Sequence, residues 1–244
     1  PEGLLPQKQI MHFENKCIGC GKCEKICHNL HTECDFCGKC VTFCPQNARE
    51  IAGKEISADE ILEIVLKDKD YYGKDGGVTF SGGEPTMQSD FLLSCLKLLR
   101  GKTNRAVQTC GFCEKDKFKE ILENCEYVLF DLKIIDDELD KKYTGASNKI
   151  ILENFEYLTK YDRDFIVRVP LIPTITDTKE NLEAIARLLK KNSIDKIELL
   201  PYNTMAGGKY AMCTREFNPM FDESVPCSPR LEIFENHKIK ATVL

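Results

Sequence analysis

The sequence predicts an α/β protein in which parallel strands alternate with helices, together with a separate cysteine-rich module. From about Ser57 onward, short runs rich in β-branched or aromatic residues alternate with amphipathic helical patterns. Ahead of that region, eight of the 14 cysteines fall between Cys17 and Cys44. Strand–helix alternation implies right-handed crossovers, and it leaves a doubly wound sheet and a barrel as the two arrangements. In both arrangements the ligand site lies at the carboxyl ends of the strands.

Apolar periodicity and end signals predict the individual elements. Ser57 and Glu60 form a capping box ahead of a helix with apolar residues at 61, 62, 64 and 65. A second helix fits Ser89–Arg100, with Gly101 as its stop. Further helical patterns cover residues 114–124, 150–161 and 178–191. The predicted strands are Gly77–Phe80, Arg105–Thr109, Tyr127–Leu132, Phe165–Pro170 and Lys196–Leu200, and Lys238–Leu244 is a candidate last strand.

Composition and charge narrow the class of protein. The chain is 42% hydrophobic and 30% charged, with a net charge of −5. This mild acidity predicts neither a nucleic-acid nor an anionic-membrane partner, since both require a basic face, and no apolar run approaches a membrane span. A disulfide-stapled secreted module is usually short and stands alone, whereas this cysteine cluster lies in a long, charged chain. Metal ligation is therefore the better interpretation, and it implies a reducing, cytoplasmic compartment.

The cysteine module contains two copies of one spacing. The copies are Cys17-x2-Cys20-x2-Cys23-x3-Cys27 and Cys34-x2-Cys37-x2-Cys40-x3-Cys44-Pro45. They resemble bacterial two-cluster ferredoxins, in which two-residue gaps place three thiolates around one cubane and the fourth thiolate ligates the other cluster. This interpretation predicts two [4Fe–4S] clusters, one held by Cys17, Cys20, Cys23 and Cys44 and the second by Cys34, Cys37, Cys40 and Cys27.

Zinc is the main alternative for this module, but zinc sites use paired Cys-x2-Cys knuckles with a long spacer. The first copy departs from the ferredoxin pattern, because His28 stands where proline is usual and the link from Cys27 to Cys34 is short. We therefore expect the first half of the module to be trimmed. His28 and His31 are predicted to be loop residues rather than ligands, since eight thiolates complete two cubanes.

A series of motifs in the remaining chain carries a second resemblance. The first, Val78–Pro85, is a strand that runs into Gly82, Gly83 and Glu84; the glycines allow close backbone approach to a ligand. The others are Val107–Gly111, Phe130–Lys133, Tyr143–Asn148, Arg168–Pro173 and Glu198–Asn203. In this order they resemble the glycyl radical enzyme activating enzymes of the radical SAM superfamily, the family that includes the activator of pyruvate formate-lyase.

The resemblance implies a fold and an activity. It implies a partial (β/α) barrel over residues 51–244, a ferredoxin-like insertion at 15–50, and a remnant of the family's N-terminal segment at 1–14. The implied reaction is reductive cleavage of S-adenosylmethionine to methionine and a 5′-deoxyadenosyl radical, which abstracts hydrogen from a glycine of a partner glycyl radical enzyme. Flavodoxin or ferredoxin would donate the electron under anaerobic conditions, and the inserted clusters would relay it.

The resemblance also implies site residues. Gly82, Gly83 and Glu84 would hold the methionine moiety of the cofactor, and Asp131 and Lys133 would face the cofactor or a monovalent cation. The implied cofactor or substrate contacts are completed by Thr109, Arg168 and Asn203. Two alternatives stay open: Arg168 pairs with an acid inside the barrel, and Asp131 caps the helix that follows. Gln108 and Asn203 replace an acid and a histidine of some members, which leaves the cation and a proton-handling role open.

The signature Cys-x3-Cys-x2-Cys of radical SAM enzymes does not occur in the sequence. In the resembling family the triplet is soon followed by Asn-Pro-Glu, and this chain begins Pro1-Glu2-Gly3. We therefore expect the catalytic cysteines and a third [4Fe–4S] cluster upstream of residue 1, together with the first barrel strand, and we expect the chain alone to be inactive. The alternative is a ferredoxin-type electron-transfer protein without its own catalysis.

The remaining cysteines receive simpler interpretations. Cys110-x2-Cys113 invites a thioredoxin-like interpretation, which we reject because the motif lies within the barrel pattern. Cys95 and Cys125 lie on apolar helix faces and are predicted core residues. Cys213 and Cys227 receive no assignment.

Overall fold

The computed structural model describes residues 8–29, 33–204, 206–213 and 216–244, and the chain divides into two compact units. The cysteine unit comprises the described residues of Pro1–Glu55 and Asn203–Pro219, and the sheet unit comprises Ile56–Tyr202 and Met220–Leu244. The predicted module at 15–50 lies within the first unit. No motif had indicated that a segment after residue 202 groups with it.

The cysteine unit is built on a short antiparallel ribbon. Strand β1 (Gln9–His12) pairs with β2 (Arg49–Ala52), so that His12 lies opposite Arg49. The unit also contains η1 (Glu14–Lys16), α1 (Lys22–Ile26), α2 (Lys39–Thr42) and α9 (Ala206–Met212). Helices α1 and α2 each follow a glycine with a left-handed backbone, Gly21 at φ 66° and Gly38 at φ 75°. The two cysteine copies thus share this backbone geometry as well as their spacing.

The sheet unit contains six parallel strands in sequence order. They are β3 (Gly77–Phe80), β4 (Asn104–Thr109), β5 (Tyr127–Asp131), β6 (Asp164–Leu171), β7 (Lys196–Pro201) and β8 (Lys240–Val243). A doubly wound sheet reverses its strand order at a switch point, whereas a (β/α) barrel does not. The strand order therefore indicates the barrel type of winding. Every predicted strand is present. The last strand is shorter than expected, because Lys238 has a left-handed φ of 55°.

The helices of the sheet unit confirm most of the predicted pattern. They are α3 (Ala58–Lys67), α4 (Ser89–Leu99), α5 (Lys115–Asn124), α6 (Asp137–Thr144), α7 (Lys149–Leu158), α8 (Lys179–Lys191) and α10 (Leu231–Asn236), with the short η2 (Lys69–Tyr71) and η3 (Pro85–Gln88). The capping box is formed, since Glu60 N donates to Ser57 Oγ at 3.2 Å and Ser57 N donates to Glu60 Oε2 at 2.8 Å. Helices α6 and α10 were not predicted.

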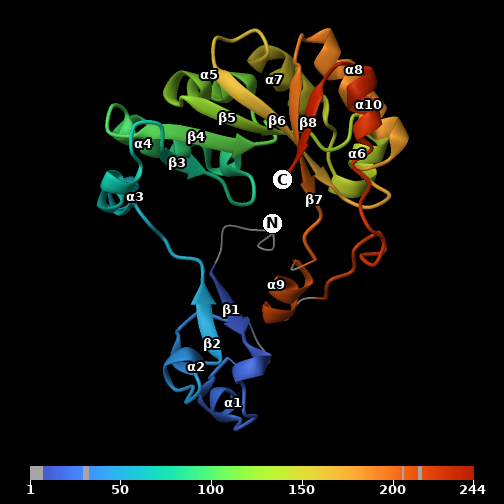
Figure 1. The fold of residues 1–244 in the computed structure, drawn as a ribbon. Coiled ribbons are helices and arrows are strands. Elements are labelled where there is room, and N and C mark those ends of the chain that lie inside the picture. Colours follow the sequence, from blue (N-terminus) through green and yellow to red (C-terminus); the bar gives the residue numbers. More distant parts are fainter. Residues whose placement is uncertain (1–7, 30–32, 205, 214–215) are drawn as a thin grey trace. The chain divides into compact units, whose positions relative to one another are not determined.

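The core lies between the sheet and the helices on one of its faces (Figure 1). Alternate strand residues such as Val107, Val128, Val167 and Leu199 are completely buried there. The Phe130 ring packs against those of Phe118 and Phe155, with centroid distances of 6.2 and 5.3 Å. Since successive side chains of a strand point to opposite faces, the residues between these core positions face away from the helices. Those residues include Asp131, Arg168 and Glu198, which lie side by side on neighbouring strands.

Candidate cofactor and cluster sites

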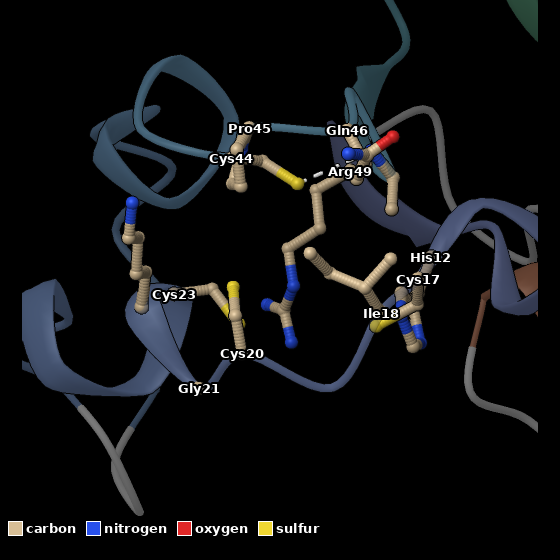
Figure 2. Close-up of a pocket in the computed structure, with 12 residues that line it drawn as sticks. His12, Cys17, Ile18, Cys20, Gly21, Cys23, Cys44, Pro45, Gln46 and Arg49 are labelled. Carbon is tan, nitrogen blue, oxygen red and sulfur yellow. Dashed lines mark hydrogen bonds between the residues drawn. The ribbon is translucent and has the colours of Figure 1, made fainter.

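One pocket of the cysteine unit gathers Cys17, Cys20, Cys23 and Cys44 (Figure 2). Three of these cysteines come from the first copy of the spacing, in the loop before α1 and in α1 itself. The fourth follows α2 of the second copy. All four are free cysteines. Four thiols around one pocket are a donor set that fits a [4Fe–4S] cluster, and the grouping is the one that the crossover interpretation predicts.

Backbone amides surround the sulfur of Cys44. Ala48 N donates to Cys44 Sγ at 3.2 Å, and the chain turns between them at Asn47, whose φ is 49°. The backbone N–H of Gln46, followed by that of Ala48, lowers the pKa of Cys44, and Arg49 acts in the same direction. These groups stabilise a thiolate, which is the form that ligates metal.

The second cysteine set is linked to His28 and Asp35. His28 Nε2 lies 3.1 Å from Asp35 Oδ2, and Asp35 Oδ1 accepts from Cys37 N at 3.2 Å. The backbone N–H of Cys37 is the main cause that lowers the pKa of Asp35. His28 was expected to be a plain loop residue, and this pairing with the second copy was missed. His31 lies outside the described residues, and the ligand set Cys27, Cys34, Cys37 and Cys40 stays a prediction.

In the sheet unit, the carboxylate of Glu84 is bonded to four groups of the protein. Its Oε1 accepts from Thr86 N at 3.1 Å, Thr86 Oγ1 at 2.7 Å and Thr109 Oγ1 at 2.6 Å. Its Oε2 accepts from Cys110 N at 2.8 Å. Thr109 is only 2% exposed, and its hydroxyl also accepts from Gly111 N at 2.8 Å. Glu84 and Thr109, both predicted cofactor contacts, thus tie the loop after β3 to the loop after β4.

Gly82 occupies the turn between β3 and Glu84. Its φ of 130° is a conformation that residues with a side chain rarely adopt, and a Cβ built there would have no other atom within 4 Å. The loop therefore combines a backbone that requires glycine with open space beside it. These properties fit the predicted close approach of a ligand at Gly82–Gly83.

A polar row crosses the face of the sheet that is turned away from the helices. Asp131 lies beside Arg168 in the strand register, and Arg168 lies beside Glu198. Arg168 Nε donates to Glu198 Oε2 at 2.7 Å, so Arg168 is paired with an acid, as one alternative predicted. Glu198 was named in a motif but not as a site residue, and only the register identifies it as the partner.

Asp131 has one unsatisfied oxygen. Its Oδ2 accepts a long hydrogen bond of 3.4 Å from Gln108 Nε2, while Oδ1 is buried and has no hydrogen-bond partner among the described residues. Burial raises the pKa of Asp131, and the nearby Lys133 acts in the opposite direction. Asp131 does not cap the following helix, because Asp136 accepts from Leu139 N at 2.8 Å and does so instead. A buried acceptor without a donor is rare in folded proteins, and it fits a bound cation or amine.

Two further predictions concern Asn203 and the pair Cys110 and Cys113. Asn203 belongs to the cysteine unit, so the structure does not test its expected place beside Arg168. Burial, followed by the charge of Glu84, raises the pKa of Cys110 to about 12 and that of Cys113 to about 11. A redox-active pair requires a lowered thiol pKa, so these shifts agree with our rejection of a thioredoxin-like motif.

Residues 32–189 match the sequence profile of the family described as the radical SAM superfamily. The chain belongs to the radical SAM superfamily. This radical SAM protein is 33% identical over 238 residues to the 4-hydroxyphenylacetate decarboxylase activating enzyme of Clostridium scatologenes, covering 89% of the chain and 76% of the relative. It is 32% identical over 227 residues to the trans-4-hydroxy-L-proline dehydratase activating enzyme of Clostridioides difficile, covering 86% of the chain and 75% of the relative.

A solved structure adds to these relatives. A domain of the pyruvate-formate lyase-activating enzyme from Bacteroides vulgatus superimposes with a TM-score of 0.55 at 28% identity, covering 69% of this chain and 98% of that one. The resemblance to activating enzymes predicted from the motifs is therefore confirmed. Membership of the radical SAM superfamily implies a [4Fe–4S] cluster and S-adenosylmethionine. Among the described residues, no helix has the length and apolar character needed to cross a membrane.

Proposed function

We propose that this chain forms the cofactor-binding sheet and the electron-relay module of an activating enzyme that installs a glycyl radical on a partner enzyme. The observation that carries the proposal is the polar edge of a radical SAM sheet, where Gly82, Gln108, Asp131 and Arg168 lie at or near the carboxyl ends of β3–β6. Ligands of parallel α/β sheets bind at this end of the strands.

Four residues at or beside this edge have separate tasks in the proposal. Gly82 and Gly83 admit the methionine end of S-adenosylmethionine to the backbone, because neither residue carries a side chain and a Cβ at Gly82 would face open space. Glu84 joins the loop after β3 to the end of β4 and the loop after it, through its hydrogen bonds from Thr109 Oγ1 and Cys110 N. Asp131 Oδ1 is the free acceptor for the cofactor's ammonium group or for a cation beside its carboxylate. The cofactor, bound beside a reduced [4Fe–4S] cluster, supplies the 5′-deoxyadenosyl radical that abstracts hydrogen from a glycine of the partner.

The cysteine unit is proposed to hold two [4Fe–4S] clusters, the first by Cys17, Cys20, Cys23 and Cys44 and the second by Cys27, Cys34, Cys37 and Cys40. Its task is to pass electrons from a flavodoxin or ferredoxin toward the catalytic cluster. Because no Cys-x3-Cys-x2-Cys triplet occurs in these 244 residues, we propose that the catalytic cysteines lie outside them.

Formation of 5′-deoxyadenosine tests this function. The 244-residue chain, reconstituted anaerobically with iron and sulfide and given a strong reductant and S-adenosylmethionine, is expected to form none. A longer protein that joins the triplet to this chain is expected to form it, and to generate a glycyl radical signal with its partner enzyme. Vigorous cleavage by the 244 residues alone contradicts the proposed division of tasks.

A second candidate function is electron transfer without catalysis. It is favoured by the pocket of four cysteines, which is complete within this chain. The same experiment separates the two functions, because a pure electron carrier gains no cleavage activity when the triplet is joined to it. Replacing Cys37 in the active longer protein is expected to spare cleavage with an artificial reductant and to cripple it with a protein donor.

A further inference from the structure

We propose that Arg49 raises the reduction potential of the cluster held by Cys17, Cys20, Cys23 and Cys44 above that of the second cluster. The inference rests on the two-cluster module of the proposed function. It concerns the order in which the two clusters accept electrons, which neither the cysteine spacing nor membership of the family determines.

Arg49 is the first residue of β2, and its side chain lines the pocket of the four cysteines. Figure 2 shows this side chain extending into the pocket among Cys17, Cys20 and Cys44. Its Nε is buried and has no hydrogen-bond partner among the described residues. A buried N–H donor is rarely left without an acceptor. The thiolate and sulfide sulfurs of a bound cluster are acceptors of the kind that this donor lacks.

A cation and N–H donors beside a cluster favour its reduced form, because that form carries one more negative charge. The first cluster site has both, since Arg49 lines it and Ala48 N donates to Cys44 Sγ at 3.2 Å. The second site also has an N–H donor, since Phe36 N donates to Cys34 Sγ at 3.4 Å, but it has a carboxylate where the first site has Arg49: Asp35 accepts from the backbone N–H of its ligand Cys37 at 3.2 Å. A negative charge disfavours reduction. The first site is therefore lined by the cation Arg49, whereas the ligand loop of the second site carries the carboxylate of Asp35, which is paired with His28 at 3.1 Å.

The consequence is an ordered one-electron reduction. A low-potential one-electron reductant reduces the Cys17 cluster first, from [4Fe–4S]²⁺ to [4Fe–4S]¹⁺, and a second electron then enters the other cluster. No proton is needed in either step. In the one-electron-reduced module, the first cluster therefore holds the electron before it is transferred onward.

A potentiometric titration of the reconstituted full chain, followed by electron paramagnetic resonance, tests the proposal. Two one-electron waves are expected for the unaltered protein. Arg49→Gln is expected to move the upper wave down by on the order of tenfold in the reduction equilibrium constant, about 59 mV, and to leave the lower wave in place. Arg49→Lys keeps the positive charge, so it should lower the upper wave by less than Arg49→Gln does. Lys22→Gln is the matched control, because Lys22 lines the same pocket but is exposed, so solvent screens its charge.

A second variant keeps the test independent of Arg49 and of its effect on cluster assembly. Asp35 is exposed, like Lys22, but it is bonded to the backbone of a ligand, so Asp35→Asn is expected to raise the lower wave by less than Arg49→Gln lowers the upper one, and to narrow the gap between the waves. The inference is overturned if the potential of the upper wave is unchanged in Arg49→Gln at full iron content. An equal shift of both waves, or a single wave in the unaltered protein, also overturns it. Iron content of one cluster, or zinc in place of iron, instead overturns the two-cluster module, so the two failures are distinguishable.

Discussion

At the scale of single residues, the structure distinguishes polar side chains that are hydrogen-bonded within the protein from polar side chains that keep an atom without a partner among the described residues. Glu84 and Thr109 were both predicted to contact the cofactor, yet their polar atoms are bonded to the loops after β3 and β4. These bonds span 25 and 26 residues of sequence, so no local pattern could reveal them. Asp131 was predicted as a site residue and retains a free buried oxygen. Sequence motifs find such residues, but only the packed structure shows which of their atoms are available.

Asp131→Asn is expected to leave the free energy of unfolding at neutral pH unchanged or higher. Burial raises the folded-state pKa of Asp131 above its unfolded value, so the folded state loses stability as pH rises from the unfolded pKa through the folded one. Above that window the unaltered protein bears the full cost of a buried carboxylate, which the amide removes. Urea unfolding between pH 4 and 8 measures this. A gain in unfolding free energy for Asp131→Asn that grows as the pH falls contradicts this prediction. A large loss of unfolding free energy at neutral pH contradicts it too.

At the scale of elements, local signals predicted well wherever the cause was local. The capping box set the start of α3, and β-branched runs set the strands of the sheet. Helix α6 was missed because most of its residues are polar and it lacks a strong apolar stripe. Its N-cap Asp136 begins it, and Gly145 with its left-handed backbone ends it. In the cysteine unit, the ribbon of β1 and β2 was missed, because its pairing joins segments about 40 residues apart.

Two glycines after neighbouring strands offer a matched pair of variants. Gly82→Ala places a side chain at φ 130° in open space, so it is expected to cost about 1–3 kcal/mol of unfolding free energy from backbone strain alone. Gly111→Ala adds a steric term, because its Cβ would lie 2.8 Å from the Phe130 ring, and it should cost more. Chemical denaturation of both variants gives the comparison. Equal losses, or a larger loss at Gly82, would show that the space beside Gly82 is not open.

Within the cysteine unit, Cys44→Ala tests whether the two copies exchange their fourth ligand. Cys44 lines the pocket of Cys17, Cys20 and Cys23, although it belongs to the second copy. The variant is expected to lose or convert that cluster and to leave the Cys34 cluster intact. Cys27→Ala is the reciprocal control and should affect the Cys34 cluster. Electron paramagnetic resonance of the two variants should show loss of different signals; loss of the same signal in both rules out the exchange.

At the scale of the whole molecule, the sequence predicted a cysteine module and a parallel α/β sheet, and both are present as separate units. It did not predict that Asn203–Pro219 groups with the cysteine unit, because that grouping arises from contacts between distant parts of the chain. The motif order predicted the family, and the relatives confirmed it. Motif order works here because five of the six motifs lie on successive strands, β3 to β7, or directly after them, and the carboxyl ends of these parallel strands lie along one edge of the sheet.

The central claim is that this chain holds two clusters for electron relay, while the catalytic cluster has its ligands elsewhere. Iron and acid-labile sulfide, measured after anaerobic reconstitution and desalting, test it most directly, with zinc determined on the same sample. We expect about eight irons and eight sulfides per chain, the content of two [4Fe–4S] clusters. A content near twelve irons would place a third cluster within these 244 residues, and a content near four, or zinc in place of iron, would contradict the two-cluster module.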